Sequence, residues 1–281
     1  MDARISVVIN TLNEERNLPF ALASVRPWAD EIVVVDMHSD DRTVEIARAH
    51  GANVFLHERR EFVEPARAYA VAQATGDWIL VLDADELVPE PLSRTLRAIA
   101  RDDAADVVVL PRLNHLLGAP MRYTGWGPHQ DRHPRFFRRG HFRPTDLIHG
   151  SPPPQEGARV LHLAYEPGHA IVHFNYVDTA HFLDKLNRYT SIEARQAAER
   201  GERAAGPRTL ARAARVFLRR YVRQQGYRDG WRGLYLSLLM ALYRVATDAK
   251  LKEIESVGTR EAILDAYRSE ARRILDGYAA S

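Results

Sequence analysis

Runs of β-branched and aliphatic residues alternate with stretches of helical spacing over the first third of the chain. Five runs predict buried strands, at residues 5–10, 31–36, 54–56, 78–82 and 107–110. The stretches between these runs predict helices, with turn-forming or helix-capping residues at their ends. Strands that alternate with helices are typical of a parallel sheet covered by helices on both faces. The pattern therefore predicts an α/β fold.

The pattern changes between Pro111 and Pro167, where Pro, Gly, His and Arg are frequent. The aromatic residues of this stretch include Tyr123, Trp126, Phe136, Phe137 and Phe142. So many aromatic residues argue against disorder, and long irregular stretches in compact proteins are often functional. We therefore expect an ordered, site-forming stretch, in which Trp126 either stacks on a ligand or anchors the loop.

Helical spacing returns in the last third of the chain. It predicts four helices, near residues 178–200, 207–225, 229–248 and 258–279. The sequence therefore predicts two parts: an α/β domain over residues 1–178 and an α-helical region over residues 179–281.

Composition narrows the class of protein. The chain has 281 residues, 39 Lys plus Arg against 37 Asp plus Glu, and 46% hydrophobic residues, which excludes disordered and fibrous classes. It contains no cysteine, which excludes disulfide scaffolds, thiolate zinc sites and cysteine nucleophiles. The first strand begins too close to Met1 for a secretory signal, and the apolar run 233–241 is shorter than the roughly 20 residues of a spanning helix. We expect a cytoplasmic protein without a transmembrane segment.

The helical region carries an excess of positive charge. Between Gly206 and Lys252 there are eleven Arg or Lys against two Asp. Apolar positions at helical spacing are flanked by these arginines, as in helices that lie on an anionic membrane surface. An ordinary helical bundle with solvated arginines has the same pattern, so both explanations stay open. No recognised motif for RNA or DNA accompanies the charge, and nucleic acid is not an expected partner.

Acidic residues follow the predicted strands at their carboxyl ends, where parallel sheets bind ligands. Neither a glycine-rich dinucleotide fingerprint nor a P-loop occurs in the chain. Instead Asp83, Asp85 and Glu86 follow the strand 78–82, and closely spaced carboxylates repel one another unless a cation is present. Strand alternation would point Asp83 and Asp85 to the same side. The cluster predicts a divalent-metal site shared with a diphosphate, and the alternative is that these acids only cap the next helix.

Several motifs resemble family 2 glycosyltransferases of the GT-A fold. In the first part of the chain they are ISVVINTLNEE (5–15), ADEIVVVD (29–36), SDDRTVEIA (39–47), ATGDW (74–78) and DADE (83–86). Others resemble the subgroup that contains the lipopolysaccharide inner-core β-glucosyltransferases, namely RFFRRG (135–140), HFNY (173–176), KLNRYT (185–190) and DGWRG (229–233). The resemblance covers nearly the whole chain and implies inverting transfer of a sugar from a nucleotide-diphosphate donor.

The resemblance also implies roles for individual residues. The residues that would bind the nucleotide are Thr11, Glu14, Asp36, Arg67 and Asp83. Asp36 would accept a hydrogen bond from a uracil-like base. Asp85 and His173 would bind Mg²⁺ or Mn²⁺, which stabilises the charge that develops on the leaving diphosphate. Family members often have Asn after the position of Arg67, where this chain has Ala68.

Inversion requires a base that takes the proton of the acceptor hydroxyl. The candidates are Asp131, Asp146 and His149. In family members the base is a carboxylate several dozen residues after the metal motif, and this spacing favours Asp131. Some relatives carry His-Glu where this chain has His149-Gly150, so His149 remains a candidate for the base or for a metal ligand.

Taken together, these features predict a metal-dependent, inverting glycosyltransferase with a nucleotide-sugar donor, most simply a UDP-sugar. The expected acceptor is a glycolipid or polysaccharide precursor, reached in the cytoplasm or at the inner face of the cell membrane. Two alternatives stay open: transfer to a small soluble acceptor, and binding of a nucleotide sugar without turnover. A nucleotidyltransferase would need a glycine-rich loop after the first strand, which this chain lacks. The sugar, the acceptor and the oligomeric state do not follow from the sequence, although the C-terminal helices are a candidate contact in a homo-oligomer.

Overall fold

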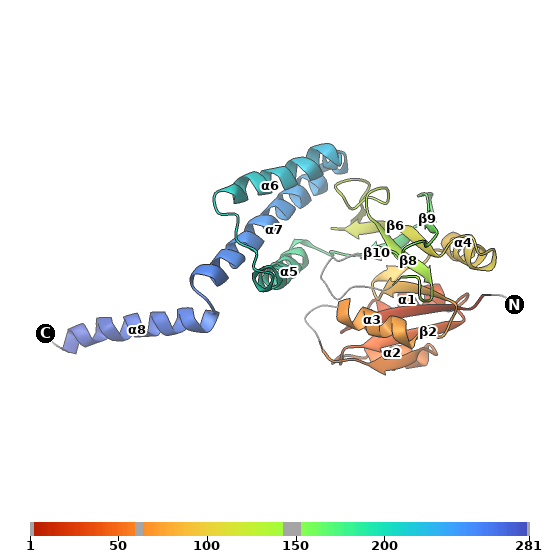
Figure 1. The fold of residues 1–281 in the computed structure, drawn as a ribbon, viewed down its shortest axis with the longest axis horizontal. Helices are drawn as coiled ribbons and strands as arrows, with labels where there is room; N and C mark the ends of the chain where they lie inside the picture. Colours follow the sequence, from red (N-terminus) through yellow and green to blue (C-terminus); the bar gives the residue numbers. More distant parts are fainter. Residues whose placement is uncertain (1–2, 60–63, 143–152, 280–281) are drawn as a thin grey trace. The chain divides into compact units, whose positions relative to one another are not determined.

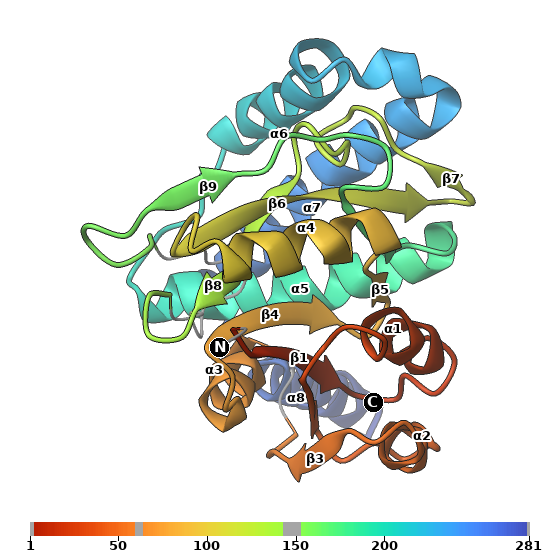
Figure 2. The ribbon, with the colours of Figure 1, turned by 90° about the vertical axis from the view of Figure 1, so that its right-hand side faces the viewer.

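The structure is a computed structural model that describes residues 3–59, 64–142 and 153–279. The chain divides into two compact units, Met1–Asp178 and Thr179–Ser281. Figures 1 and 2 show the helices and strands of both units in two views.

Parallel strands form the first half of the sheet in the first unit (Figure 2). β1 (Ile5–Thr11) lies between β2 (Glu31–Asp36) and β4 (Trp78–Asp83), and β3 (Asn53–Leu56) extends the sheet beyond β2. All of these pairs are parallel, so the carboxyl ends of the strands meet at one edge. The strands predicted in this half are confirmed, and their acidic residues gather at that edge.

Successive side chains of β1 point to opposite faces of this half-sheet, and helices cover both faces. Ile5, Val7 and Ile9 share one core with α1 (Leu18–Val25), α2 (Thr43–Ala49) and α4 (Glu90–Arg101). Val8 belongs to a second core, which contains residues of α3 (Glu64–Gln73). The result is the predicted layered α/β arrangement.

The second half of the sheet is mixed. β8 (Arg132–Arg138) runs antiparallel to both of its neighbours, β4 and β6 (Val107–Leu116). β10 (Ile171–Phe174) is parallel to β6 and antiparallel to β5 (Glu86–Leu87). The strand order is β3-β2-β1-β4-β8-β6-β10-β5, and β6 also pairs with β7 (Ala119–Pro120) and β9 (Val160–His162).

The expectation of an irregular stretch between Pro111 and Pro167 is wrong for β8 and for the end of β6. β8 begins with polar residues and contains Pro134, which is unusual inside a sheet. Pro134 lies opposite Val109 at the point where the register between β8 and β6 shifts. Such an irregularity tolerates a residue that has no backbone N–H, so the strand continues into the buried Phe136 and Phe137.

The second unit is helical. α7 (Gly230–Ser256) packs against α5 (Thr179–Glu199) and α6 (Arg208–Leu218). A π-helical turn, η1 (Arg219–Arg223), and a 3₁₀ turn, η2 (Gly226–Asp229), connect α6 to α7. The predicted helices are present, but the second changes to π geometry after Leu218 and the third continues to Ser256.

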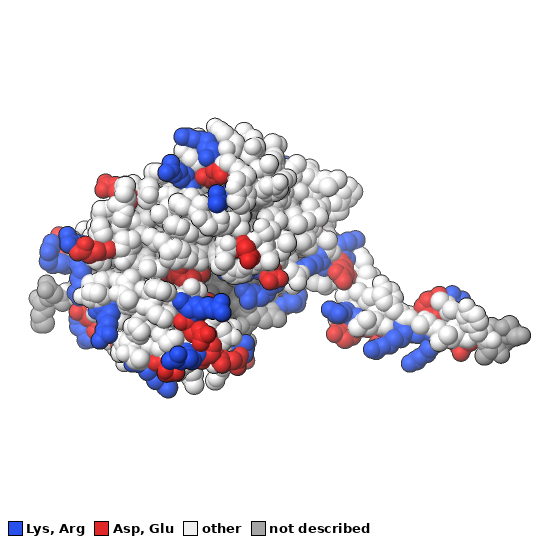
Figure 3. Space-filling view, turned by 180° about the vertical axis from the view of Figure 1, so that it is seen from behind, with Lys and Arg blue, Asp and Glu red and all other residues white. Residues whose placement is uncertain are grey.

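The last helix, α8 (Arg260–Ala279), carries side chains of both charges (Figure 3). Ion pairs join Arg268 to Asp265 at 3.1 Å and Arg273 to Glu270 at 2.6 Å. Most of its larger apolar side chains are exposed to solvent. No helix in the described part of the chain combines the length and the apolar composition that a bilayer crossing requires.

Candidate active site

The loops after β1 and β2 meet at the carboxyl edge of the sheet. Asp36 ends β2 and is fully buried. Its Oδ1 accepts hydrogen bonds from Thr11 Oγ1 (3.0 Å) and Ser39 Oγ (2.5 Å), and its Oδ2 accepts one from the Ser39 backbone N–H (2.8 Å). These bonds tie the end of β1 to the loop after β2. Contact of Thr11 and Asp36 with a nucleotide stays a prediction, and both oxygens of Asp36 already bond within the protein.

Glu14 lies in the loop after β1. Its backbone N–H donates to Thr43 Oγ1 at 2.8 Å, and its carboxylate accepts a hydrogen bond from Asn17 Nδ2 at 2.8 Å. The side chain is half-buried. It borders the edge of the sheet without entering the core, and its role in nucleotide binding stays a prediction.

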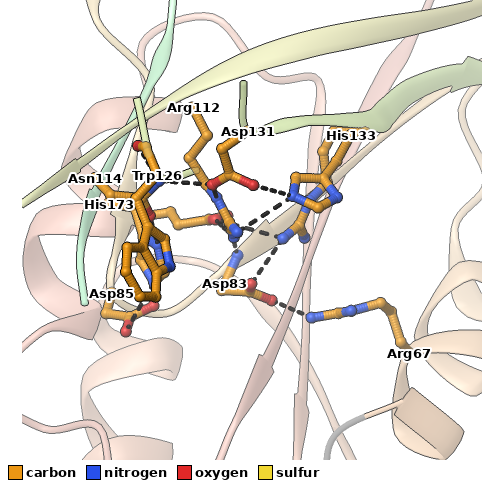
Figure 4. Close-up of polar contacts among 11 residues, drawn as sticks. Arg67, Asp83, Asp85, Arg112, Asn114, Trp126, Asp131, His133 and His173 are labelled. Atoms are coloured by element: carbon orange, nitrogen blue, oxygen red, sulfur yellow. Dashed lines mark hydrogen bonds and ion pairs between the residues drawn. The ribbon is translucent and has the colours of Figure 1, made fainter. Parts of the chain in front are cut away.

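Asp83 ends β4 and lies between two guanidinium groups (Figure 4). Arg67 of α3 donates from Nη2 to Oδ1 at 2.5 Å, and Arg135 of β8 donates from Nη2 to Oδ2 at 2.8 Å. Burial raises the pKa of Asp83, but the charges of Arg135 and Arg67 outweigh burial and hold that pKa well below its ordinary value. Asp83 is therefore an ionised carboxylate with both oxygens engaged.

Glu86 is fully buried beside Asp83. Its Oε1 pairs with Arg112 Nη1 at 3.1 Å and with Arg135 Nη2 at 3.4 Å, and its Oε2 accepts the Asp83 backbone N–H at 2.9 Å. Arginines therefore balance the charge of Asp83 and Glu86, contrary to the expectation that this acidic cluster requires a cation.

Asp85 points away from these arginines. β4 ends at Asp83 and residues 84 and 85 form a turn, so strand alternation does not apply and the expectation that Asp83 and Asp85 point to the same side is wrong. β5 pairs with β10, with Glu86 opposite His173, and this pairing brings the turn to His173. Asp85 Oδ2 lies 3.4 Å from His173 Nε2.

Asn114 orients the imidazole of His173. The Asn114 amide nitrogen donates to Asp131 Oδ2 (2.6 Å) and to the Trp126 carbonyl (2.9 Å), so its Oδ1 is the acceptor for His173 Nδ1 at 2.7 Å. With Nδ1–H donating to Asn114, Nε2 is directed at Asp85. Metal-binding histidines typically have such a hydrogen bond on the other ring nitrogen.

Asp85 and His173 fit a divalent cation. Their facing oxygen and nitrogen atoms are farther apart than a hydrogen bond, and two lone pairs in this position repel unless a proton or a cation lies between them. A carboxylate with an imidazole suits Mn²⁺ better than Mg²⁺, which favours oxygen ligands. Among the described residues no group of three or more His, Asp or Glu side chains could hold a metal. A cation here would take its remaining ligands from the substrate and from water.

Asp131 precedes β8 and accepts contacts from three side chains (Figure 4). Arg112 Nε lies 2.8 Å and Asn114 Nδ2 2.6 Å from Oδ2, and His133 Nε2 lies 2.7 Å from Oδ1. Burial raises the pKa of Asp131, but Arg112 and then His133 outweigh burial and hold that pKa far below the ordinary value. Asp131 is therefore ionised and connected through Asn114 to His173.

A tight turn holds Trp126 beside Asn114. Thr124 and Gly125 have left-handed backbone angles, with φ of 62° and 83°. A side chain on Gly127 would place its Cβ only 2.0 Å from the Arg122 carbonyl oxygen, so this position requires glycine. The turn places the Trp126 carbonyl within hydrogen-bond distance of Asn114, which supports an anchoring role for this loop.

Two predicted residues are outside the described part of the chain, and some residues of the site were not predicted. Asp146 and His149 lie outside the described residues, so their roles stay predictions. Sequence reasoning assigned no role to Arg112, Asn114 or Arg135, although these polar residues of β6 and β8 bond to Asp83, Glu86, Asp131 and His173. Arg112 and Asn114 stand at alternate positions of one strand, and this spacing is the signal that would have placed them on one face.

Several curated proteins are similar in sequence to this chain. The chain is 27% identical over 272 residues to the lipopolysaccharide core biosynthesis glycosyltransferase LpsC of Rhizobium meliloti, covering 93% of this chain and 97% of that protein. It is 25% identical over 274 residues to an uncharacterized glycosyltransferase of Rickettsia typhi, covering 92% and 90%. A TPR repeat-containing protein of Synechococcus elongatus is 45% identical over 84 residues, 30% of this chain and about a fifth (21%) of that protein.

A solved structure is similar over part of the chain, and a family model matches more than half of the chain. Glucosyl-3-phosphoglycerate synthase from Mycobacterium tuberculosis, in complex with Mn²⁺, UDP and glucosyl-3-phosphoglycerate, has a TM-score of 0.35 and 27% identity, covering 40% of this chain and 44% of that chain. The model of glycosyl transferase family 2 matches residues 6–159. The fold, the acidic edge of the sheet and this match together show that the chain belongs to glycosyltransferase family 2.

Proposed function

We propose that this chain transfers a sugar from a UDP-sugar to a hydroxyl of a glycolipid or polysaccharide precursor, with inversion at the anomeric carbon and with a divalent cation. The observation that supports the proposal is that Asp85 faces His173, and that Asn114 bonds both to His173 and to the ionised Asp131. One amide joins a cation site, which would stabilise the leaving diphosphate, to an ionised carboxylate, which would act as the base of inverting transfer.

The donor half of the site lies at the ends of β1, β2 and β4. The residues that we assign to the nucleotide are Thr11, Glu14, Asp36, Arg67 and Asp83. Arg67 reaches Asp83 from α3, and a diphosphate offers the same guanidinium a bidentate partner. A cation held by Asp85 and His173 would stabilise the negative charge of the departing diphosphate.

UDP, GDP and ADP, each titrated with and without Mn²⁺, test the donor assignment. We expect UDP to bind and Mn²⁺ to tighten its binding, because the cation joins the diphosphate to Asp85 and His173. Turnover with UDP-sugars then tests transfer, and the anomeric configuration of the product, read by NMR, tests inversion. If the protein binds none of UDP, GDP and ADP, the donor assignment is overturned. Tight UDP-sugar binding without transfer or hydrolysis would favour a binding protein without turnover.

We assign the base to Asp131, with His149 as the other catalytic candidate. We expect Asp131→Asn to lower transfer about 10²- to 10⁴-fold while UDP still binds. Because the pKa of Asp131 lies far below its ordinary value, its carboxylate stays ionised as the pH falls, and kcat/KM does not decline through Asp131 near pH 4, about where an ordinary Asp titrates. The measurement is the pH profile of kcat/KM for the wild type and the variant. Full activity in Asp131→Asn would move the base to His149 or Asp146.

An anionic membrane surface is the partner that we propose for the second unit. We call residues 218–232, from the end of α6 to the first turn of α7, the helical tip. Its exposed apolar side chains are Leu218 (55%), Val222 (55%), Tyr227 (53%) and Trp231 (53%). The tip contains five arginines and one acid, Asp229. Apolar and aromatic side chains among arginines suit the interface of a bilayer that carries negative charge.

Vesicle flotation tests this surface. We expect the wild type to float with vesicles that contain anionic lipid and not with zwitterionic vesicles. Arg219→Glu with Arg223→Glu should lower binding at least about tenfold, because each basic residue near such a surface contributes about 1 kcal/mol. Arg268→Glu with Arg272→Glu makes the same charge change in α8 and serves as the control. An equal loss in both double variants, or no binding by the wild type, would favour a small soluble acceptor.

A further inference from the structure

The bonds around Asp131 leave its carboxylate little capacity to take a proton by itself. Oδ1 faces His133 at 2.7 Å, and Oδ2 accepts hydrogen bonds from Arg112 at 2.8 Å and from Asn114 at 2.6 Å. The side chain is only 12% exposed. A general base works best when its pKa is close to the working pH, and the pKa of Asp131 lies far below even its ordinary value. Asp131 is therefore well placed to stabilise a positive charge, but it is a weak base.

His133 is the more exposed member of the pair that it forms with Asp131. It is the second residue of β8, and its side chain is 38% exposed. Its ring contacts the described residues through Nε2 alone, which lies 2.7 Å from Asp131 Oδ1 and 3.2 Å from Arg112 Nη2. Nδ1 bonds to none of the described residues and is not buried. Nδ1 is therefore the ring nitrogen that a substrate can reach.

The charges around His133 determine where its proton lies. Because Asp131 is ionised, its short contact with Nε2 requires a hydrogen on Nε2. Burial and the positive charges of Arg112 and Arg135 lower the pKa of His133 below its ordinary value, although Asp131 raises it. At neutral pH the imidazole is therefore uncharged, with Nε2–H donating to Asp131 and a lone pair on Nδ1. An imidazole base requires this state, and a carboxylate behind it stabilises the imidazolium that forms.

We propose that His133 Nδ1 takes the proton of the acceptor hydroxyl and that Asp131 acts through His133. The hydroxyl oxygen forms its bond to the anomeric carbon, the bond from this carbon to the diphosphate oxygen breaks, and its electron pair leaves with UDP. The hydroxyl proton passes to Nδ1, and Asp131 holds the resulting imidazolium through Nε2–H until water removes the proton. The inference rests on the proposed function and refines its base: His133 is the catalytic residue, and Asp131 is the positioning residue.

The protonation of His133 tests the inference without turnover. In ¹H–¹⁵N NMR spectra of the imidazoles, His133→Gln identifies the signal of His133 by its loss. We expect a neutral ring with the hydrogen on Nε2 at pH 7, and protonation only below the ordinary pKa of histidine, about 6.5. Asp131→Asn should lower the pKa of His133 further, because it removes the negative charge that stabilises the imidazolium. An imidazolium at pH 7, or a hydrogen on Nδ1, would overturn the inference.

His133→Gln tests the proton transfer itself. Its amide can donate to Asp131 in place of Nε2–H, but it has no group that takes a proton near pH 7. The measurement is release of UDP from UDP-glucose with Mn²⁺, because water and an acceptor hydroxyl lose their proton to the same base. We expect release to fall about 10²- to 10⁴-fold while UDP binds as tightly as to the wild type. The control is His162→Gln, at an exposed position of β9, which should change neither quantity.

The outcomes separate this inference from the proposed function. UDP release by His133→Gln at the rate of the wild type would overturn the inference and leave Asp131 to take the proton itself. Weaker UDP binding by His133→Gln would also overturn it, since it would mean that His133 takes part in donor binding. If the wild type releases no UDP at all, the proposed function itself fails and the inference fails with it.

Discussion

We expect that Mn²⁺ no longer tightens UDP binding once Asp85 is replaced by alanine, and that sugar transfer falls at least about a thousandfold. The expectation follows from the geometry of the turn at residues 84–85. Asp85 is the DADE carboxylate that faces His173, whereas Asp83 and Glu86 are engaged by arginines. Without Asp85 the imidazole alone cannot hold a cation against the diphosphate. The measurement is calorimetric titration of UDP with and without Mn²⁺, followed by transfer rates.

His173→Ala should have the same effect as Asp85→Ala, and the two losses should not add, because both side chains would hold one ion. Asp40→Ala is the matched control. Asp40 lies after β2, and its side chain is exposed and forms an ion pair with Arg59. Retention of the Mn²⁺ effect in Asp85→Ala would exclude the Asp85 and His173 pair as the cation site and leave the proposed donor site without a metal.

Arg135→Leu is expected to destabilise the first unit by about 3–5 kcal/mol. Arg135 pairs with Asp83 at 2.8 Å and with Glu86 at 3.4 Å, and its own side chain is only 9% exposed. Removing it leaves two carboxylates short of a partner, one of them fully buried. For a unit of this size the loss corresponds to a melting temperature lower by about 6–20 °C, measured by thermal unfolding without nucleotide.

Arg138→Leu serves as the control for this prediction. Arg138 belongs to the same strand, but its side chain is 36% exposed; it pairs with the exposed Asp103 and lies 3.6 Å from Asp106. Exposed ion pairs contribute about 1 kcal/mol or less. A melting temperature of Arg135→Leu equal to that of Arg138→Leu would show that Arg112 and Arg67 suffice to balance the buried carboxylates.

The sequence alone was enough to predict the parallel half of the sheet. β1, β2 and β4 are largely apolar runs buried on both faces, and a run of this kind indicates burial without any knowledge of its neighbours. The helical region was predictable for a similar reason, since helical spacing is a local property. The acidic strand ends and the family motifs then located the site at one edge of the sheet.

Only the tertiary structure decided which charged side chains pair with one another in the site. β8 carries polar residues and a proline, so its local pattern does not indicate a central strand, and only its position between β4 and β6 buries Arg135. For that reason the arginines that neutralise Asp83 and Glu86 were not predictable, and the acids were assigned to a cation as a group.

Asp85 and His133 show the same limit. Whether Asp85 meets His173 depends on the pairing of β5 with β10, two strands far apart in the chain. His133 stands out only because the fold places the ionised Asp131 against one of its ring nitrogens and leaves the other without a bond to the described residues. Local patterns in a sequence encode which residues are buried and which elements they form, whereas the partner of a buried charge or amide depends on strand pairing across the fold, and that is where the chemistry of this site is determined.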